Sequence, residues 1–145
     1  MTILCALSKN AFSHDGSLVL TVENTNGMLT YSLSKNEKVI EDLAPIIHHP
    51  EINCQYLIRI KANCNPRSDR IIKHGFHIDT TTKCTTAIFY VNSNNGYTEF
   101  EDGTKVESIE NRFVTFPSHL QHTGTTCTDQ KRRIVINFNY YEPNE

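Results

Sequence analysis

The stretch RRIVINFNYY, residues 132–141, predicts a long β-strand with two unlike faces. Side chains two positions apart on a strand project to the same face of the sheet. One face is apolar and is expected to pack against another layer; it holds Ile134, Ile136, Phe138 and Tyr140. The other is polar enough to line a cavity; it holds Arg133, Val135, Asn137 and Asn139. Arg132 shares the parity of the apolar face, so we assign Arg133 to the predicted cavity.

Six further strands are predicted between residue 55 and this stretch, at short and regular spacing. They are expected at 55–61, at the segment of His77 and Asp79, and at 85–92, 97–100, from 104, and 112–116. Residues 63–69 form a predicted loop, and Asp102-Gly103 predicts a two-residue hairpin turn. With no helix among them, these strands indicate a mainly β fold of the sandwich or barrel type.

The N-terminal third carries the only substantial helix that the sequence predicts. Ser34 is a candidate N-cap, apolar residues recur at helical spacing from 39 to 47, and Pro50 ends the pattern. Before it, a strand at 18–22, a turn at 24–27 and a returning strand at 28–33 are expected. We therefore predict one domain over 1–145, with a support region at 1–53 and a β core at 54–141.

Composition narrows the functional classes. The chain has 145 residues and a net charge of −2, from 14 basic and 16 acidic residues, which argues against broad nucleic-acid binding. It has five cysteines, an odd number, with no Cys-x-x-Cys pair, and we expect free thiols in a reducing compartment. No signal peptide or membrane span is predicted. These features together predict a soluble cytoplasmic protein.

The stretch His77-Ile78-Asp79 offers half of a metal site. On an extended strand, His77 and Asp79 project to the same side, so an imidazole and a carboxylate meet at one point. A further histidine from a distant strand would complete a two-His-one-carboxylate set, which leaves part of the metal open. His119 and His122 are the candidates. The structural alternative is a buried His–Asp hydrogen bond.

Two residues predict an anion site in the same cavity. The guanidinium of Arg133 can bind a carboxylate through two parallel hydrogen bonds, which a lysine cannot do. Tyr90 shares a strand face with Ile88, and its phenol could donate to the same anion. The predicted cavity therefore combines metal ligands with groups for a carboxylate.

This set of motifs resembles the Fe(II)- and 2-oxoglutarate-dependent oxygenases, and in particular their prolyl-hydroxylase-like branch. The similarity lies in His77-x-Asp79, in the strand AIFYVN that contains Tyr90, in the segment RFVTFPS before His122, and in RIVINF with Arg133. Further stretches, 95–104 and 124–129, resemble the small phage and marine-bacterial members. In the family the distal histidine follows the Phe-Pro-Ser segment, which favours His122 over His119.

The resemblance implies a double-stranded β-helix, or jelly roll, over residues 54–141. It implies that His77, Asp79 and His122 bind Fe(II) and are the catalytic residues, and that Arg133 and Tyr90 bind 2-oxoglutarate. Asn137 occupies a position that often carries a small polar side chain near this cosubstrate. One departure is Asn139, which stands where the nucleic-acid demethylase branch has a second arginine.

The activity that the resemblance implies is hydroxylation of an unactivated C–H bond, with O2 consumed and succinate and CO2 released. The substrate is expected to be a peptidyl proline, with a small molecule as the alternative. Two other functions stay open: a cupin-like metalloenzyme that does not use 2-oxoglutarate, and a non-catalytic β-sandwich binding module. No membrane partner is expected, and the sequence leaves the oligomeric state open.

Overall fold

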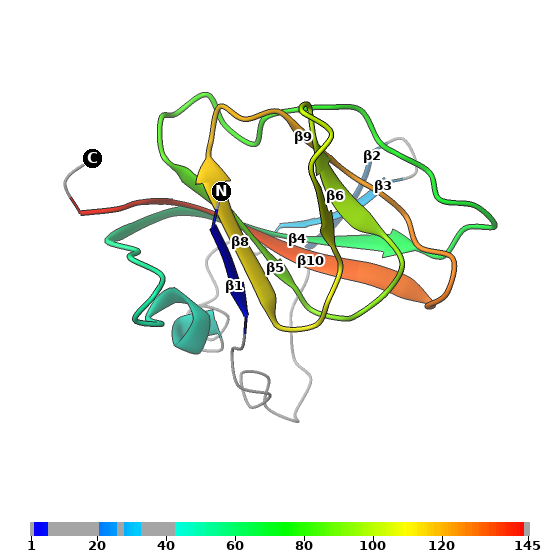
Figure 1. Cartoon of the computed structure of the whole chain (residues 1–145), viewed down its shortest axis with the longest axis horizontal. Coiled ribbons are helices and arrows are strands. Elements are labelled where there is room, and N and C mark those ends of the chain that lie inside the picture. The colour runs from blue at the N-terminus through cyan, green and yellow to red at the C-terminus, as the bar shows by residue number, and fades with distance from the viewer. Residues whose placement is uncertain (1, 6–20, 26–27, 33–42, 144–145) are drawn as a thin grey trace.

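The structure, a computed structural model, describes residues 2–5, 21–25, 28–32 and 43–143 (Figure 1). Residues 43–47 are helical, and the predicted start of this helix lies outside the described residues. The described strands are β1 (Thr2–Cys5), β2 (Thr21–Thr25), β3 (Met28–Ser32), β4 (Tyr56–Pro66), β5 (Thr85–Tyr90), β6 (Tyr97–Phe100), β7 (Lys105–Glu107), β8 (Arg112–Pro117), β9 (His122–Gly124) and β10 (Arg132–Tyr141).

The strands form two antiparallel sheets of a jelly-roll fold. The larger sheet has the order β1-β8-β5-β10-β4-β3-β2, and the smaller has the order β7-β6-β9. In Figure 1, β6 and β9 lie on one side of the larger sheet and the helical turn lies on the other. The mainly β prediction is therefore confirmed. No helix in the described part of the chain has the length and apolar character that crossing a membrane requires.

Strand β10 is central because each of its faces serves a different layer. Its predicted apolar face packs against the helical turn, in a core that includes Leu43, Ile46, Ile136, Phe138 and Tyr140. Its other face looks toward the smaller sheet, where Val135 joins a second cluster with Phe100 and Val106. The predicted division of β10 into two faces is thus confirmed, and the cavity lies on the second face.

From residue 55 onward the described chain has seven strands, as predicted, but their membership differs. The segment of His77 and Asp79 is not a regular strand. It follows β9 through isolated bridges instead: the N–H of His77 donates to the carbonyl of His122, and the reverse bond is also made, each at 3.0 Å. The predicted strand is therefore reduced to a short extension of the smaller sheet.

Two loop predictions were wrong in their details. The expected loop at 63–69 begins later, because β4 continues to Pro66 in register with Arg132 of β10. The β6–β7 hairpin has three loop residues rather than two, since the N–H of Phe100 donates to the carbonyl of Thr104 at 2.9 Å. Gly103 ends this loop with φ = 84°, the left-handed conformation that glycine supplies at such a position.

In the N-terminal part, the predicted hairpin is present with a shifted first strand. β2 and β3 pair antiparallel, with Thr25 opposite Met28, so Asn24 and Thr25 belong to the strand rather than to the turn. Positions 18–20 of the predicted strand lie outside the described residues. β3 pairs with β4, so this hairpin extends the larger sheet. The sequence did not predict β1, which pairs with β8 at the opposite edge.

Candidate metal and anion site

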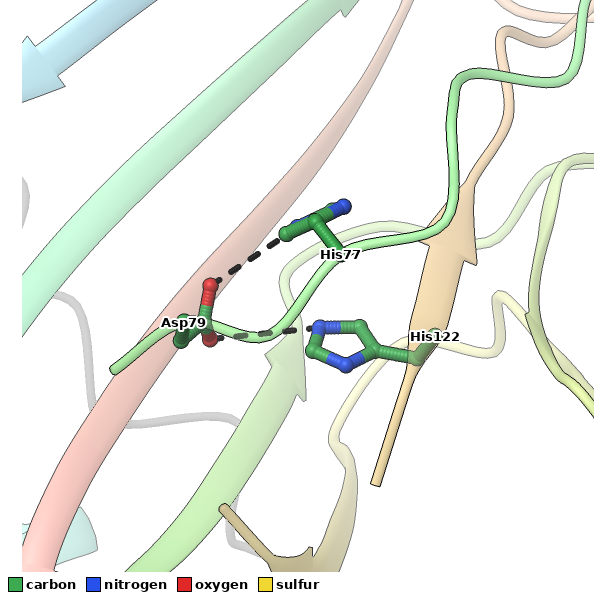
Figure 2. A group of neighbouring side chains, drawn as sticks. All are labelled: His77, Asp79 and His122. Carbon is green, nitrogen blue, oxygen red and sulfur yellow. Dashed lines mark ion pairs between the residues drawn. The ribbon is translucent and has the colours of Figure 1, made fainter. Parts of the chain in front are cut away.

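His77, Asp79 and His122 are brought together from two segments that are distant in sequence. Their candidate ligand atoms all lie within 4.8 Å of one another. In Figure 2, Asp79 turns one oxygen toward each ring: Oδ1 lies 3.8 Å from His77 Nε2, and Oδ2 lies 3.9 Å from His122 Nε2. Atoms that share a metal ion at about 2.1 Å, at right angles, are about 3 Å apart. An inward movement of roughly 1 Å would therefore close the set around an ion.

Both imidazoles present the nitrogen that a metal requires. His77 Nδ1 lies 3.1 Å from the carbonyl of Gly75, and His122 Nδ1 lies 3.2 Å from the carbonyl of Leu120. A carbonyl only accepts, so each Nδ1 carries a hydrogen, and in the neutral form of either ring Nε2 then presents its lone pair. His122 Nε2 is buried without a hydrogen-bond partner, and burial lowers the pKa of this ring despite the nearby carboxylate of Asp79. A neutral imidazole with an unpartnered Nε2 fits a metal ligand.

Asn137 holds the carboxylate of the set. Its amide Nδ2 donates to Asp79 Oδ2 at 2.9 Å, and its Oδ1 accepts a bond of 3.3 Å from Asn63. These contacts extend from β4 through β10 to Asp79 and leave Asp79 Oδ1 directed at His77. Asn137, predicted to contact a cosubstrate, therefore lines the cavity and also orients a candidate metal ligand.

The set opens into a cavity of about 490 Å³ between the two sheets. Ten of its fourteen lining residues are polar or charged; the lining consists of Lys61, Asn63, Asn65, His74, Gly75, His77, Asp79, Ile88, Thr98, His122, Gly124, Arg133, Val135 and Asn137. Two cations, Lys61 and Arg133, stand against the single carboxylate of Asp79, so the lining favours an anionic ligand. A larger cavity of about 720 Å³, beside loop residues 93–97, has none of the metal-capable set in its lining.

Arg133 is a buried cation that lacks an anion. The residue is 1% exposed; Nε donates to Ser108 Oγ at 2.8 Å and Nη2 to Thr98 Oγ1 at 3.1 Å. Among the described residues, no carboxylate lies within ion-pair distance of it. A buried charge normally has an opposite charge beside it, because its transfer from water is costly. Arg133 therefore marks the place where an anionic ligand would bind.

Tyr90 lies beneath Arg133 rather than in the cavity wall. The tyrosine is fully buried, its hydroxyl donates to Thr98 Oγ1 at 2.8 Å, and the guanidinium carbon of Arg133 lies 5.7 Å from the ring centroid. Burial also raises the pKa of the phenol. The predicted strand face of Tyr90 is correct, but in this arrangement it supports Arg133 and Thr98 and does not line the cavity.

The structure separates the two candidate histidines and adds residues that the sequence analysis missed. His119 is exposed and lies outside the cavity, whereas His122 is 2% exposed and belongs to the set. Thr98 and Ser108 were not predicted, although the parity of Thr98 and Phe100 on β6 could have indicated an inward-facing hydroxyl. His74 was not predicted either, and it lines the cavity.

Comparison with known proteins supports the fold. No protein-family model and no curated protein matches the sequence. A 2OG-Fe(II) oxygenase family protein from Burkholderia pseudomallei matches with a TM-score of 0.64 and 12% identity, over 85% of this chain and 72% of that one. A Trichoplax adhaerens prolyl hydroxylase, solved with a hypoxia inducible factor peptide fragment, matches at 0.52 and 15%, over 80% and 63%.

The same fold also occurs in a protein whose description names no oxygenase. Drosophila melanogaster CENP-C bound to CAL1 matches with a TM-score of 0.50 and 9% identity, over 83% of this chain and 79% of that one. At these identities the similarity shows the fold alone. The chain is therefore a jelly-roll protein whose structural neighbours include 2-oxoglutarate oxygenases and a prolyl hydroxylase.

Proposed function

We propose that this protein is an Fe(II)- and 2-oxoglutarate-dependent dioxygenase that hydroxylates an unactivated C–H bond and releases succinate and CO2. The observation that carries the proposal is the position of Arg133. Its buried, unpaired guanidinium lines the same cavity as a metal-capable set of two histidines and one aspartate. A metal set alone would serve many enzymes, whereas a buried cation beside it selects a ligand with an anionic end.

The ligand that fits these two features is elongated and carries an anion at one end. Asn137, which contacts Asp79, and Arg133 are four residues apart on β10. At roughly 3.3 Å per residue, their Cα atoms are separated by about 13 Å. Both residues line the cavity. A dicarboxylate with a metal-binding group at its other end, such as 2-oxoglutarate, matches this arrangement.

In this proposal each residue has a distinct task. His77, Asp79 and His122 would hold Fe(II) from one side and leave the remaining positions open. Iron, when bound, supplies the oxidation chemistry together with O2 and 2-oxoglutarate. Asn137 keeps the Asp79 carboxylate oriented, and Arg133 fixes the distal carboxylate of the cosubstrate. Tyr90, Thr98 and Ser108 hold the guanidinium in place through the contacts described above.

For the substrate we propose a peptidyl proline, in a peptide or protein. Large apolar side chains lie exposed next to the candidate metal ligands: Phe76 and Ile78 flank His77, and Leu120 precedes His122 by two residues. Exposed apolar side chains beside a site favour a partner with apolar surface. The solved prolyl hydroxylase that holds a peptide fragment has the same fold.

We also propose a cytoplasmic location, since Cys54, Cys64 and Cys127 form no disulfide.

The direct test is succinate formation from 2-oxoglutarate with Fe(II), measured with and without proline-containing peptides. We expect turnover in the wild type and none in His77→Ala or Asp79→Ala. His119→Ala is the matched control, because it removes an exposed histidine outside the set. Unchanged succinate formation in either ligand variant would contradict the proposal. Stimulation by a small molecule and by no peptide would contradict the substrate class alone.

A further inference from the structure

His74 is a second imidazole in the cavity that the candidate metal set does not use. Its Nε2 is buried and has no hydrogen-bond partner, and the residue lines the same cavity as Arg133. Its backbone is held on both sides: the N–H donates to the carbonyl of Gly124 at 3.0 Å, and the carbonyl accepts 2.7 Å from Thr123 Oγ1. A buried polar atom without a protein partner, on a backbone held at both sides, is available to bind a ligand in the cavity.

A local irregularity directs His74 into the cavity. Lys73 lies opposite Thr125 and His77 lies opposite His122, so four steps on one side match three on the other. One extra residue of this kind is a β-bulge, which reverses the alternation of side chains beyond it. His74 and His77 are three positions apart, and both line the cavity.

Gly124 lies next to both the backbone of His74 and the end of Arg133. A methyl group on Gly124 would lie 3.4 Å from Arg133 Nη1, so the guanidinium passes close to the residue that pairs with His74. Arg133 donates from Nε to Ser108 and from Nη2 to Thr98, whereas its Nη1 has no protein acceptor among the described residues. Burial is the main cause of a lowered pKa at His74, followed by the charge of Arg133. A neutral ring has one N–H to donate.

We propose that His74 and Arg133 together form the cradle that binds the distal carboxylate of 2-oxoglutarate. The inference rests on the proposed function and adds a specific binding residue to it. His74 donates from Nε2 to one carboxylate oxygen, and Arg133 donates from Nη1. His74 thus takes the role that the sequence analysis assigned to Tyr90, whose hydroxyl is already bonded to Thr98.

The test compares two ligands and three variants by calorimetric titration of the Mn(II)-loaded protein without O2. The ligands are 2-oxoglutarate and 2-oxobutanoate, which keeps the 2-oxo acid end and lacks the distal carboxylate. His74→Phe removes the donor at similar ring size, His74→Gln retains an N–H, and His119→Phe is the exposed control. The stabilisation by Mn(II) in thermal unfolding shows whether each variant is folded with a working metal set.

We expect His74→Phe to weaken 2-oxoglutarate binding about tenfold or more, as for the loss of a hydrogen bond to a charged group. His74→Gln should lie within about threefold of the wild type, and 2-oxobutanoate should bind all variants alike. Wild-type affinity for 2-oxoglutarate in His74→Phe would overturn the inference and leave the proposed function intact. An equal loss for both ligands would overturn it too. No binding of 2-oxoglutarate by the wild type would instead overturn the proposed function itself.

Discussion

Replacing Arg133 with leucine tests the central feature of the site. The guanidinium is 1% exposed, donates to two hydroxyls and has no carboxylate partner among the described residues. Leucine keeps an apolar side chain over the ring of Tyr90 and removes the charge. If Arg133 exists to bind an anionic end group, the change should remove the affinity for that group and leave the metal set intact.

The expected loss of affinity follows from the burial of the ion pair that Arg133 would form with the ligand carboxylate. Truncating one partner of a buried, hydrogen-bonded charge pair costs about 2–5 kcal/mol. At 1.4 kcal/mol per factor of ten, this is a loss of roughly 30-fold to several thousand-fold in the affinity for 2-oxoglutarate. In the absence of ligand, Arg133→Leu should leave the free energy of unfolding unchanged or raise it. A buried charge without a partner is costly, so we expect its exchange for an apolar side chain to be neutral or stabilising.

Calorimetric titration of the Mn(II)-loaded protein with 2-oxoglutarate measures the loss, and thermal unfolding without ligand measures the stability. Arg132→Leu is the matched control, since Arg132 is the neighbouring residue on β10 and is exposed. The titration with 2-oxobutanoate should be unchanged in both variants. Affinity for 2-oxoglutarate within about twofold of the wild type in Arg133→Leu would refute the reasoning. So would an equal loss in Arg132→Leu.

Three further outcomes are expected. Gly96→Ala should lower the free energy of unfolding by about 1–3 kcal/mol in urea and weaken 2-oxoglutarate binding, because a Cβ there would lie 2.7 Å from Arg133 Cδ. Gly75→Ala, where a Cβ meets nothing within 4 Å, should leave the stability unchanged. His122→Ala should abolish the thermal stabilisation by Mn(II), and a shift equal to the wild type's would exclude His122 as a ligand. Burial lowers the pKa of His122 and of His74, so the unfolded state takes up protons first and the metal-free protein should lose stability as the pH falls below about 6.5. Denaturation midpoints that stay level between pH 8 and pH 5.5 would contradict this assignment.

The sequence predicted the fold best where a strand separates two different environments. β10 packs Ile136 and Phe138 against the helical turn and presents Arg133 and Asn137 to the cavity. The two-residue alternation of side chains along this strand therefore predicted both the packing of β10 and the position of Arg133. The same reasoning placed Tyr90 on the correct face of β5. It could not show that the tyrosine lies below the guanidinium. Whether a side chain on the inner face reaches the cavity depends on how the two sheets pack against each other.

Alternation failed where the backbone departs from a regular strand. The segment from Lys73 to His77 contains one residue more than its partner, so strand parity counted back from His77 could not have predicted His74 in the cavity. His77 and Asp79 were still predicted to converge, since they lie beyond the irregularity. The β6–β7 hairpin shows the same limit, because Asp102-Gly103 suits a two-residue turn, whereas the register of Phe100 with Thr104 adds one residue. Such insertions depend on pairing with strands that are distant in sequence.

The fold does not decide between an oxygenase, another metalloenzyme and a binding module, since structures of different description share it. The charges of the cavity support the oxygenase that we propose. A binding module has no need of His122 Nε2, which is buried without a partner. A metalloenzyme without a diacid ligand accounts for the unpartnered Nε2 of His122. It does not account for Arg133, a buried cation that contacts two hydroxyls and an aromatic ring. A ligand that chelates a metal and ends in a carboxylate accounts for both. Stabilisation by Mn(II) that increases further with 2-oxoglutarate, but not with 2-oxobutanoate to the same extent, is the outcome that only the oxygenase requires.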